Sequence, residues 1–369
     1  MKKTFCAFLC FIVFAGVLRV SATDISAKAA VVINGDTGDI LYGKNENMPL
    51  PMASTTKIMT ALLLCENIPD LEKAVTVNET AVRVEGTSMG LKAGETVKCR
   101  DLLYGMLLSS GNDAANAAAI AVSGSIEEFV RLMNKKAADM GLENTGFATP
   151  SGLDGEGHRT TAYELALITK TAMLNKDFAA AAATKSVSLK YGTPETLHTL
   201  VNHNRLLKER ADICGVKTGF TKKAGRCLVT AGKQDGKYVI TVTLNDGNDW
   251  ADHKTLTDLG YGKLKTDTEI FPQKYVYIPV TSGGTVKAEI PALKIAADEN
   301  RTAFTAEVLP HFVYPPIKRG DTLGFAYYCV DGRVVGKMAI TAASENPAPQ
   351  NSKIKKIKTL FAEMLCRAA

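Results

Sequence analysis

The sequence lacks the cysteine and histidine patterns that bind metals or carry redox chemistry. Its eight cysteines contain no C-x-x-C pair, and their wide spacing defines no disulfide pairing. Its five histidines form no H-E-x-x-H motif, and no cysteine and histidine cluster has the spacing of a zinc site. The sequence therefore predicts neither a metal ion nor another cofactor.

The chain also lacks a broad excess of charge of either sign. Lysine and arginine number 44, against 38 aspartate and glutamate residues. The basic excess lies before residue 23 and after residue 352. This distribution argues against a nucleic-acid partner and for a local basic feature at the C-terminus.

The N-terminus has the pattern of a targeting segment. Residues 5–18 are an apolar run that follows Lys2 and Lys3, and small residues then allow cleavage after Ala22. We interpret residues 1–22 as a secretory signal peptide, which predicts an exported protein. An uncleaved membrane anchor is the alternative, although the apolar run is short for a span.

The remaining composition, 46% hydrophobic and 22% charged over the whole chain, is that of a globular protein long enough for two domains. β-Branched runs at residues 29–33 and 40–42 predict two strands. From about Phe271, short β-type runs alternate with turns and predict a separate all-β domain. Apolar periodicity predicts helices at residues 58–65, 101–109, 114–122, 127–140 and 161–174.

Ser54 and Lys57 stand three residues apart at the start of a predicted helix, so we expect their side chains to share one face. Pro51 suits a first helical position, and we expect the helix to begin there. A lysine takes a proton from a hydroxyl only when its amine is neutral, which burial and a second cation both favour. The spacing alone is weak evidence, because it recurs at Ser352 and Lys355.

Two further motifs follow in the chain. Ser110 and Asn112 lie in a polar turn between two predicted helices. Lys217, Thr218 and Gly219 lie on a predicted strand of an antiparallel group. Taken singly, the first of these motifs is equally typical of an ordinary turn between two helices. The second is equally typical of a solvated lysine beside a turn glycine.

A competing motif occurs at residues 86–90, which match the G-x-S-x-G nucleophile elbow of α/β-hydrolases with Ser88 at its centre. That elbow requires a strand before it and a helix after it. The residues that follow do not open a helix, so we reject Ser88 as the nucleophile.

The order S-x-x-K, S-x-N and K-T-G resembles the penicillin-binding proteins and class A β-lactamases. Residues 152–168, 202–207 and 215–229 resemble, more narrowly, the low-molecular-mass D-alanyl-D-alanine carboxypeptidases, which are serine hydrolases. The resemblance implies an α+β fold of the transpeptidase/β-lactamase type. In that fold an antiparallel five-stranded sheet packs against a helical cluster, and here the small all-β domain follows.

The resemblance implies catalytic roles for three residues. Ser54 attacks the penultimate D-alanine carbonyl of a peptidoglycan stem peptide, and Lys57 is its general base. Ser110 relays a proton to the leaving D-alanine, while Asn112 holds the substrate and orients Lys57. Water then hydrolyses the acyl-enzyme, and β-lactam antibiotics are expected to act as covalent inhibitors.

The resemblance also implies a substrate-binding strand. Lys217 and Thr218 bind the terminal carboxylate, Gly219 belongs to the same motif, and the backbone N–H groups of Ser54 and Phe220 form the oxyanion hole. The sequence departs from the family's pattern at two places, one just after the predicted middle helices and one after the Lys-Thr-Gly strand. Ser151 replaces a histidine that members often carry, and residues 249–254 lack an arginine that many members use for the carboxylate.

Two alternatives stay open. A class A β-lactamase would need a Glu-x-x-x-Asn element after the second motif, and none of Glu143, Glu156 and Glu164 stands four residues before an asparagine. A non-catalytic peptidoglycan-binding or sensor protein is the other alternative, and the intact motifs argue against it.

We divide the exported chain into a catalytic domain (23–268), a β-domain (269–343), a Pro-containing linker (344–352) and a C-terminal helix (353–369). That helix has apolar residues on one side and lysines mainly on the other, and it is too short to span a bilayer. It is expected to anchor the enzyme on the membrane surface, at the outer face of the cytoplasmic membrane or in the cell wall.

Overall fold

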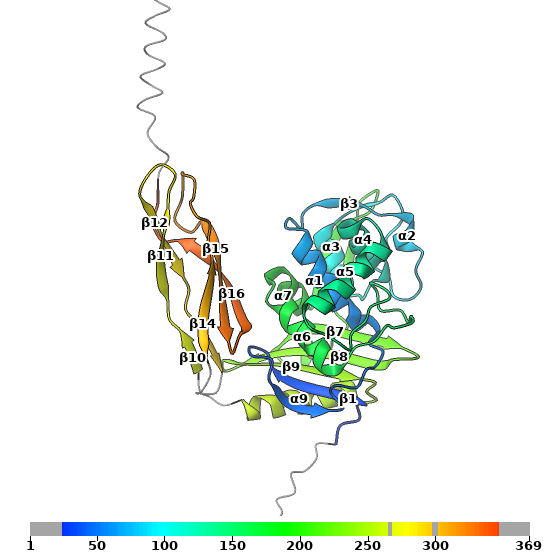
Figure 1. The fold of residues 1–369 in the computed structure, drawn as a ribbon. Helices are drawn as coiled ribbons and strands as arrows, with labels where there is room; N and C mark the ends of the chain where they lie inside the picture. Colours follow the sequence, from blue (N-terminus) through cyan, green and yellow to red (C-terminus); the bar gives the residue numbers. More distant parts are fainter. Residues whose placement is uncertain (1–23, 265–267, 297–301, 347–369) are drawn as a thin grey trace, which may run out of the picture.

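The computed structural model describes residues 24–264, 268–296 and 302–346, which form two domains (Figure 1). The larger domain is built on an antiparallel sheet with the strand order β2-β1-β9-β8-β7. The two strands predicted near its N-terminus are confirmed. The sheet contains β1 (Ala29–Asn34), β2 (Ile40–Lys44), β7 (Ile213–Thr221), β8 (Gly225–Gln234) and β9 (Lys237–Leu244).

Helices cover both faces of this sheet. Val31 and Ile33 pack into the core shared with the main helical cluster, whereas Ala30 and Val32 pack on the other side against α9. The five predicted helices are confirmed as α1 and α3 to α6. The helices are α1 (Lys57–Asn67), α2 (Glu79–Val82), α3 (Cys99–Leu107), α4 (Asn112–Ser123), α5 (Ile126–Asp139), α6 (Ala162–Met173), α7 (Lys176–Ala183), α8 (Leu206–Glu209) and α9 (Asp249–Lys263).

Side-chain caps explain where two of the predicted helices begin. Ser125 accepts a hydrogen bond from the N–H of Glu128 at the start of α5, and Thr161 accepts one from Glu164 at the start of α6. Two small hairpins border the cluster. They pair β3 (Ala74–Thr76) with β4 (Thr96–Lys98), and β5 (Ser186–Tyr191) with β6 (Thr196–Val201).

The prediction that Pro51 is the first helical residue is wrong. Ala53–Thr56 form a 3₁₀ turn, η1, and α1 begins only at Lys57. Ala53 has a φ of 49°, a left-handed conformation that an α-helix does not contain. Ser54 therefore lies in the turn that leads into the helix.

The second domain is all-β, as predicted. Its main sheet has the order β11-β12-β16-β15-β14, and β10 pairs with β13 beside it. Fully buried side chains such as Val286, Tyr328 and Ile340 form a core separate from that of the catalytic domain. The strands are β10 (Thr268–Phe271), β11 (Lys274–Pro279), β12 (Thr285–Ile290), β13 (Leu293–Ala296), β14 (Ala303–Val308), β15 (Thr322–Val330) and β16 (Arg333–Ala342).

The hairpin between β15 and β16 contacts the catalytic domain, and Figure 1 shows β16 facing α6 and α7. The amine of Lys170, on α6, donates a hydrogen bond to the carbonyl of Val334 at 2.5 Å. Arg333 lies 3.5 Å from the carboxylate of Asp39. These contacts join the base of the β-domain to the catalytic domain.

Several predictions fall outside the residues that the structure describes. They are the signal peptide at 1–22, most of the linker at 344–352 and the membrane-anchor helix at 353–369. In the described part of the chain, every helix is too short or too polar to cross a membrane.

The contact between α9 and the sheet gives a stability prediction. A Cβ at Gly260 would lie 2.8 Å from Val32 Cγ1, whereas one at Gly262, in the same helix, would meet nothing within 4 Å. We expect Gly260→Ala to lower the free energy of unfolding by about 1–3 kcal/mol. Gly262→Ala should raise it by up to about 1 kcal/mol, through helix propensity. Urea unfolding compares the two, and equal stability would contradict this packing.

Candidate active site

The first two motifs meet at one buried amine. Lys57 Nζ lies 2.9 Å from Ser54 Oγ and 2.7 Å from Asn112 Oδ1. A third contact, at 2.7 Å, joins it to the backbone carbonyl of Ser151 in the loop between α5 and α6. The sequence motifs indicated the first two partners. They did not indicate Ser151, because a backbone carbonyl leaves no side-chain pattern in a sequence.

These partners orient the amine when it is neutral. The carbonyls of Asn112 and Ser151 can only accept hydrogen bonds, so they take the two N–H groups. The Asn112 amide is fixed in this orientation because its Nδ2 donates to the carbonyl of Glu85 at 2.6 Å. The lone pair of Lys57 is then left for the hydroxyl of Ser54, the one partner of the three that can donate.

The surroundings keep Lys57 neutral. Its side chain is fully buried, and burial lowers the pKa of its amine well below the usual lysine range. The positive charge of Lys217 lowers this pKa further, while Asp113 opposes the shift. Burial also lowers the pKa of Lys217, to about 7. A carboxylate bound beside Lys217 would favour its charged form.

Asp113, one residue after the second motif, fixes the turn that carries this motif. Its carboxylate accepts hydrogen bonds from the Ser88 hydroxyl at 2.6 Å and from the N–H groups of residues 89–91 at 2.9 to 3.0 Å. The Thr87 hydroxyl donates to the carbonyl of Ser110 at 2.7 Å. These bonds hold Ser110 at a φ of 61°.

The G-x-S-x-G segment is therefore a structural loop. Within the described residues it lies in irregular chain between α2 and β4, without the strand and helix that flank a nucleophile elbow. The hydroxyl of Ser88 donates to a carboxylate that is already occupied by backbone N–H groups. This geometry agrees with the rejection of Ser88 as the nucleophile.

The loop that supplies the Ser151 carbonyl is hydrogen-bonded to η1, the turn that carries Ser54. Thr56 Oγ1 lies 2.8 Å from His158 Nε2, and the Ala148 N–H donates to Nδ1 of the same ring at 3.0 Å. Burial lowers the pKa of His158 to about 4, so the ring is neutral near pH 7. Gly152 permits the close approach, because a Cβ there would lie 2.0 Å from a backbone carbonyl of η1.

The third motif lies on β7, directly beside η1. A Cβ at Gly219 would lie 3.1 Å from the backbone nitrogen of Ser54, so the absence of a side chain lets the two segments meet. The amine of Lys217 donates to the carbonyl of Thr218 at 2.9 Å. Phe220, next along the strand, is 66% exposed. The structure thus brings the third motif to the turn that carries the first.

A guanidinium lies near residues 249–254, where the sequence lacks the arginine that the resemblance implies. Arg226, on β8, pairs in register with Phe220 and forms an ion pair with Asp249 at 2.5 Å. Its Cζ atom lies 5.8 Å from the centre of the Trp250 ring. The sequence around residues 249–254 does not reveal this cation, because it comes from a neighbouring strand.

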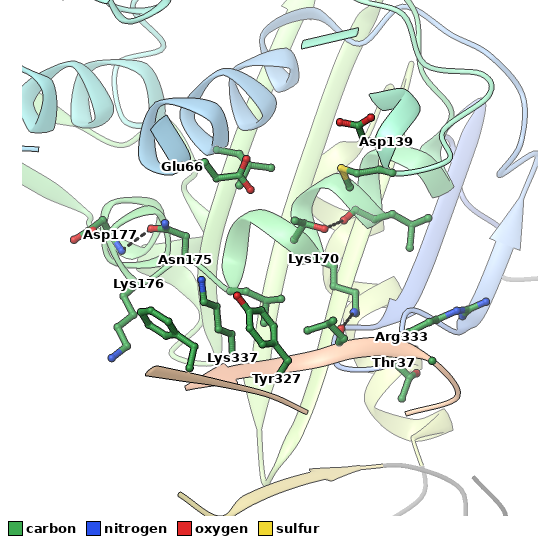
Figure 2. Close-up of a pocket in the computed structure, with 18 of the residues that line it drawn as sticks. Thr37, Glu66, Asp139, Lys170, Asn175, Lys176, Asp177, Tyr327, Arg333 and Lys337 are labelled. Atoms are coloured by element: carbon green, nitrogen blue, oxygen red, sulfur yellow. Dashed lines mark hydrogen bonds between the residues drawn. The ribbon is translucent and has the colours of Figure 1, made fainter. Parts of the chain in front are cut away.

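A cleft of about 1090 Å³ lies between the two domains and is lined by none of the motif residues. Figure 2 shows Tyr327 and Lys337 of the β-domain on one wall, opposite Asn175 and Lys176 of the catalytic domain. Across the residues that the structure describes, no group of three or more His, Cys, Asp or Glu side chains could hold a metal ion.

Comparison with known proteins shows the family to which the chain belongs. The model of the D-alanyl-D-alanine carboxypeptidases matches residues 17–248. The chain belongs to this family. It is therefore a serine hydrolase, and the expected fold and enzyme class are confirmed.

Named relatives extend the likeness beyond the catalytic domain. The D-alanyl-D-alanine carboxypeptidase DacF of Bacillus subtilis is 32% identical over 345 residues, 89% of this chain and 87% of the relative. DacC of Escherichia coli is 33% identical over 275 residues, 70% of this chain and 67% of the relative. The crystal structure of the Streptomyces K15 DD-transpeptidase superposes with a TM-score of 0.63 at 30% identity, over 66% of this chain and all of that one.

The role of the Asp113 carboxylate in fixing the Ser110 turn can be tested by comparing two variants. Asp113→Ala would leave buried backbone N–H groups unpaired and release the Ser110 turn, so covalent labelling by a fluorescent penicillin should slow by at least about tenfold. Ser88→Ala removes one of several bonds and should change the labelling rate by less than about threefold. Loss of labelling in a folded Ser88→Ala variant would restore the nucleophile-elbow interpretation.

Proposed function

We propose that the chain removes the terminal D-alanine from peptidoglycan stem pentapeptides through an acyl-enzyme on Ser54. The observation that carries this proposal is the buried amine of Lys57, 2.9 Å from Ser54 Oγ, with carbonyl acceptors on its other sides. Such an amine can take the proton as Ser54 attacks. Family membership supports the choice of a D-alanyl-D-alanine substrate.

In the acylation step, Ser54 Oγ forms a bond to the carbonyl carbon of the penultimate D-alanine while its proton passes to Lys57. The negative charge that develops on the carbonyl oxygen is stabilised by the backbone N–H groups of Ser54 and Phe220. Collapse of the tetrahedral intermediate breaks the peptide bond, and Ser110 relays the proton held by Lys57 to the nitrogen of the departing D-alanine, so that Lys57 is neutral again and Ser110 keeps its hydroxyl. Water then hydrolyses the ester and regenerates Ser54.

Lys217 and Thr218 bind the carboxylate of the terminal D-alanine. The nearly full burial of Lys217 supports this role, because an unpaired ammonium is costly there and a carboxylate would relieve that cost. Asn112 both orients Lys57 and offers its amide to the substrate. β-Lactams carry a carboxylate and a reactive carbonyl, and we infer that they acylate Ser54.

The chain's glutamates make a β-lactamase activity the weaker proposal. Glu164, on α6, accepts hydrogen bonds from the Asn144 N–H at 3.0 Å and from the Thr145 hydroxyl at 2.5 Å, and so holds a loop. Glu143 and Glu156 are exposed. We therefore expect the penicilloyl-enzyme to hydrolyse slowly. The stoichiometry of penicillin turnover distinguishes the two activities.

We further propose that the protein acts outside the cytoplasmic membrane. A wall-directed family, the expected signal peptide at residues 1–22 and the basic, amphipathic residues 353–369 support this location. The last segment would hold the enzyme on the membrane surface without spanning it.

The identity of the nucleophile has a direct test. Wild-type protein should release free D-alanine from a stem pentapeptide and be labelled covalently by a fluorescent penicillin. Ser54→Ala should lose both reactions while keeping its thermal unfolding temperature. Labelling that survives in Ser54→Ala would exclude the proposed acyl-enzyme.

Replacement of Lys217 by alanine should change the pH dependence of kcat/KM. The charge of Lys217 lowers the pKa of Lys57, so Lys217→Ala raises that pKa and less of the base is neutral at a given pH. The acidic limb of kcat/KM should move to higher pH, and KM for a D-Ala-D-Ala peptide should rise. Lys222→Ala, at an exposed position after the same strand, is the control. A profile in Lys217→Ala that matches this control would contradict both roles.

A further inference from the structure

The β-domain ends, away from the catalytic domain, in a short segment that runs beside β11 (Figure 1). The Val313 N–H donates to the carbonyl of Pro279 at 2.9 Å, and the Thr281 N–H donates to the carbonyl of Val313 at 3.0 Å. This pairing is a single parallel bridge between Val280 and Val313, at the turn between β11 and β12. It fixes the direction in which the neighbouring side chains point.

Three aromatic residues share the outer face of the domain beside this bridge. Val313 packs against the core of the domain, so Phe312 and Tyr314, on either side of it, point outward. Tyr277 lies on the same outward face of β11, because alternate residues of that strand are buried. Their exposed fractions are 65% for Tyr277, 49% for Phe312 and 71% for Tyr314. We call these three residues the aromatic rim.

Two members of the aromatic rim are in direct contact. The rings of Phe312 and Tyr314 pack edge to face with their centres 5.6 Å apart. Clustered apolar side chains on a soluble domain usually mark a binding surface. Tyrosine, with an apolar ring and a polar tip, is typical of the boundary between water and lipid.

Asn346, the last residue that the structure describes, lies near this rim. Asn346 pairs with Ile317, which is three residues after Tyr314, through hydrogen bonds of 2.8 and 2.9 Å. Residues 347–369 therefore continue from the same end of the domain. They contain lysines at 353, 355, 356 and 358, interspersed with apolar residues.

We propose that the aromatic rim enters the interfacial layer of an anionic lipid bilayer, beside the point where the C-terminal segment reaches the membrane. The exposed charges that follow the rim along the chain balance those beside Asn346 and the last turn, since Lys318 and Arg319 are matched in number by Asp321 and Glu345. Attraction to anionic headgroups therefore comes from the lysines of the C-terminal segment. The rim adds apolar contact, which salt does not screen.

Tryptophan substitutions in the chain from Thr23 to Ala369, which lacks the expected signal peptide, test this contact. Tyr314→Trp places a fluorescent reporter on the rim, and Trp250 gives a constant background as the chain's own tryptophan. With vesicles of phosphatidylglycerol and phosphatidylcholine, the emission of Tyr314→Trp should shift to the blue and be quenched by brominated acyl chains. Phe304→Trp is the matched control, because Phe304 is 47% exposed on β14 beside the hairpin that contacts the catalytic domain.

A second pair of variants measures the contribution of the rim. Phe312→Ser/Tyr314→Ser should weaken vesicle binding by about tenfold at high salt, whereas Phe304→Ser should not change it. Release of D-alanine from a soluble peptide should be equal in all these variants, so failure of the membrane contact is distinguishable from failure of the proposed chemistry. The proposal is overturned if the protein binds vesicles without quenching in Tyr314→Trp, which would assign binding to the tail alone. It is equally overturned if the protein does not bind vesicles, which would leave the rim to another partner.

Discussion

The candidate active site depends on a lysine amine that stays neutral inside the protein. Lys57 is fully buried, and desolvation together with the charge of Lys217 disfavours its protonated form. Two carbonyl acceptors then leave its lone pair facing Ser54. Without this constraint the amine would be a cation at neutral pH and could not accept a proton from Ser54.

The surrounding structure keeps three separate pieces of chain at this amine. The turn η1, which carries Ser54, is fixed to the loop at residues 148–158 through the contact between Thr56 and His158. The turn with Ser110 is fixed through Asp113, and β7 reaches η1 because Gly219 has no side chain. Each contact comes from a different element, so the sheet and the helical cluster must assemble before the site exists.

The sequence predicts the helices and strands in which buried residues recur at a regular spacing. The helices α1 and α3 to α6, the strands β1 and β2 and the all-β domain are all visible as apolar patterns. Apolar periodicity does not reveal α9, because this helix buries polar groups: His253 lies 2.9 Å from Thr230 and 3.0 Å from Thr243 on the sheet. The sequence also does not predict the left-handed conformation of Ala53 or the hydrogen bond between Lys57 and the Ser151 carbonyl, because both depend on contacts between distant segments.

The most direct test of this account is the protonation state of Lys57 itself. NMR of protein labelled with ¹³C at lysine Cε, with the Lys57 signal assigned through Lys57→Arg, reports whether that amine is charged. Lys57 is expected to give the signal of a neutral amine at pH 7 and to become protonated only at lower pH. An ammonium signal at pH 7 that titrates near the ordinary lysine value of about 10.4 would contradict it.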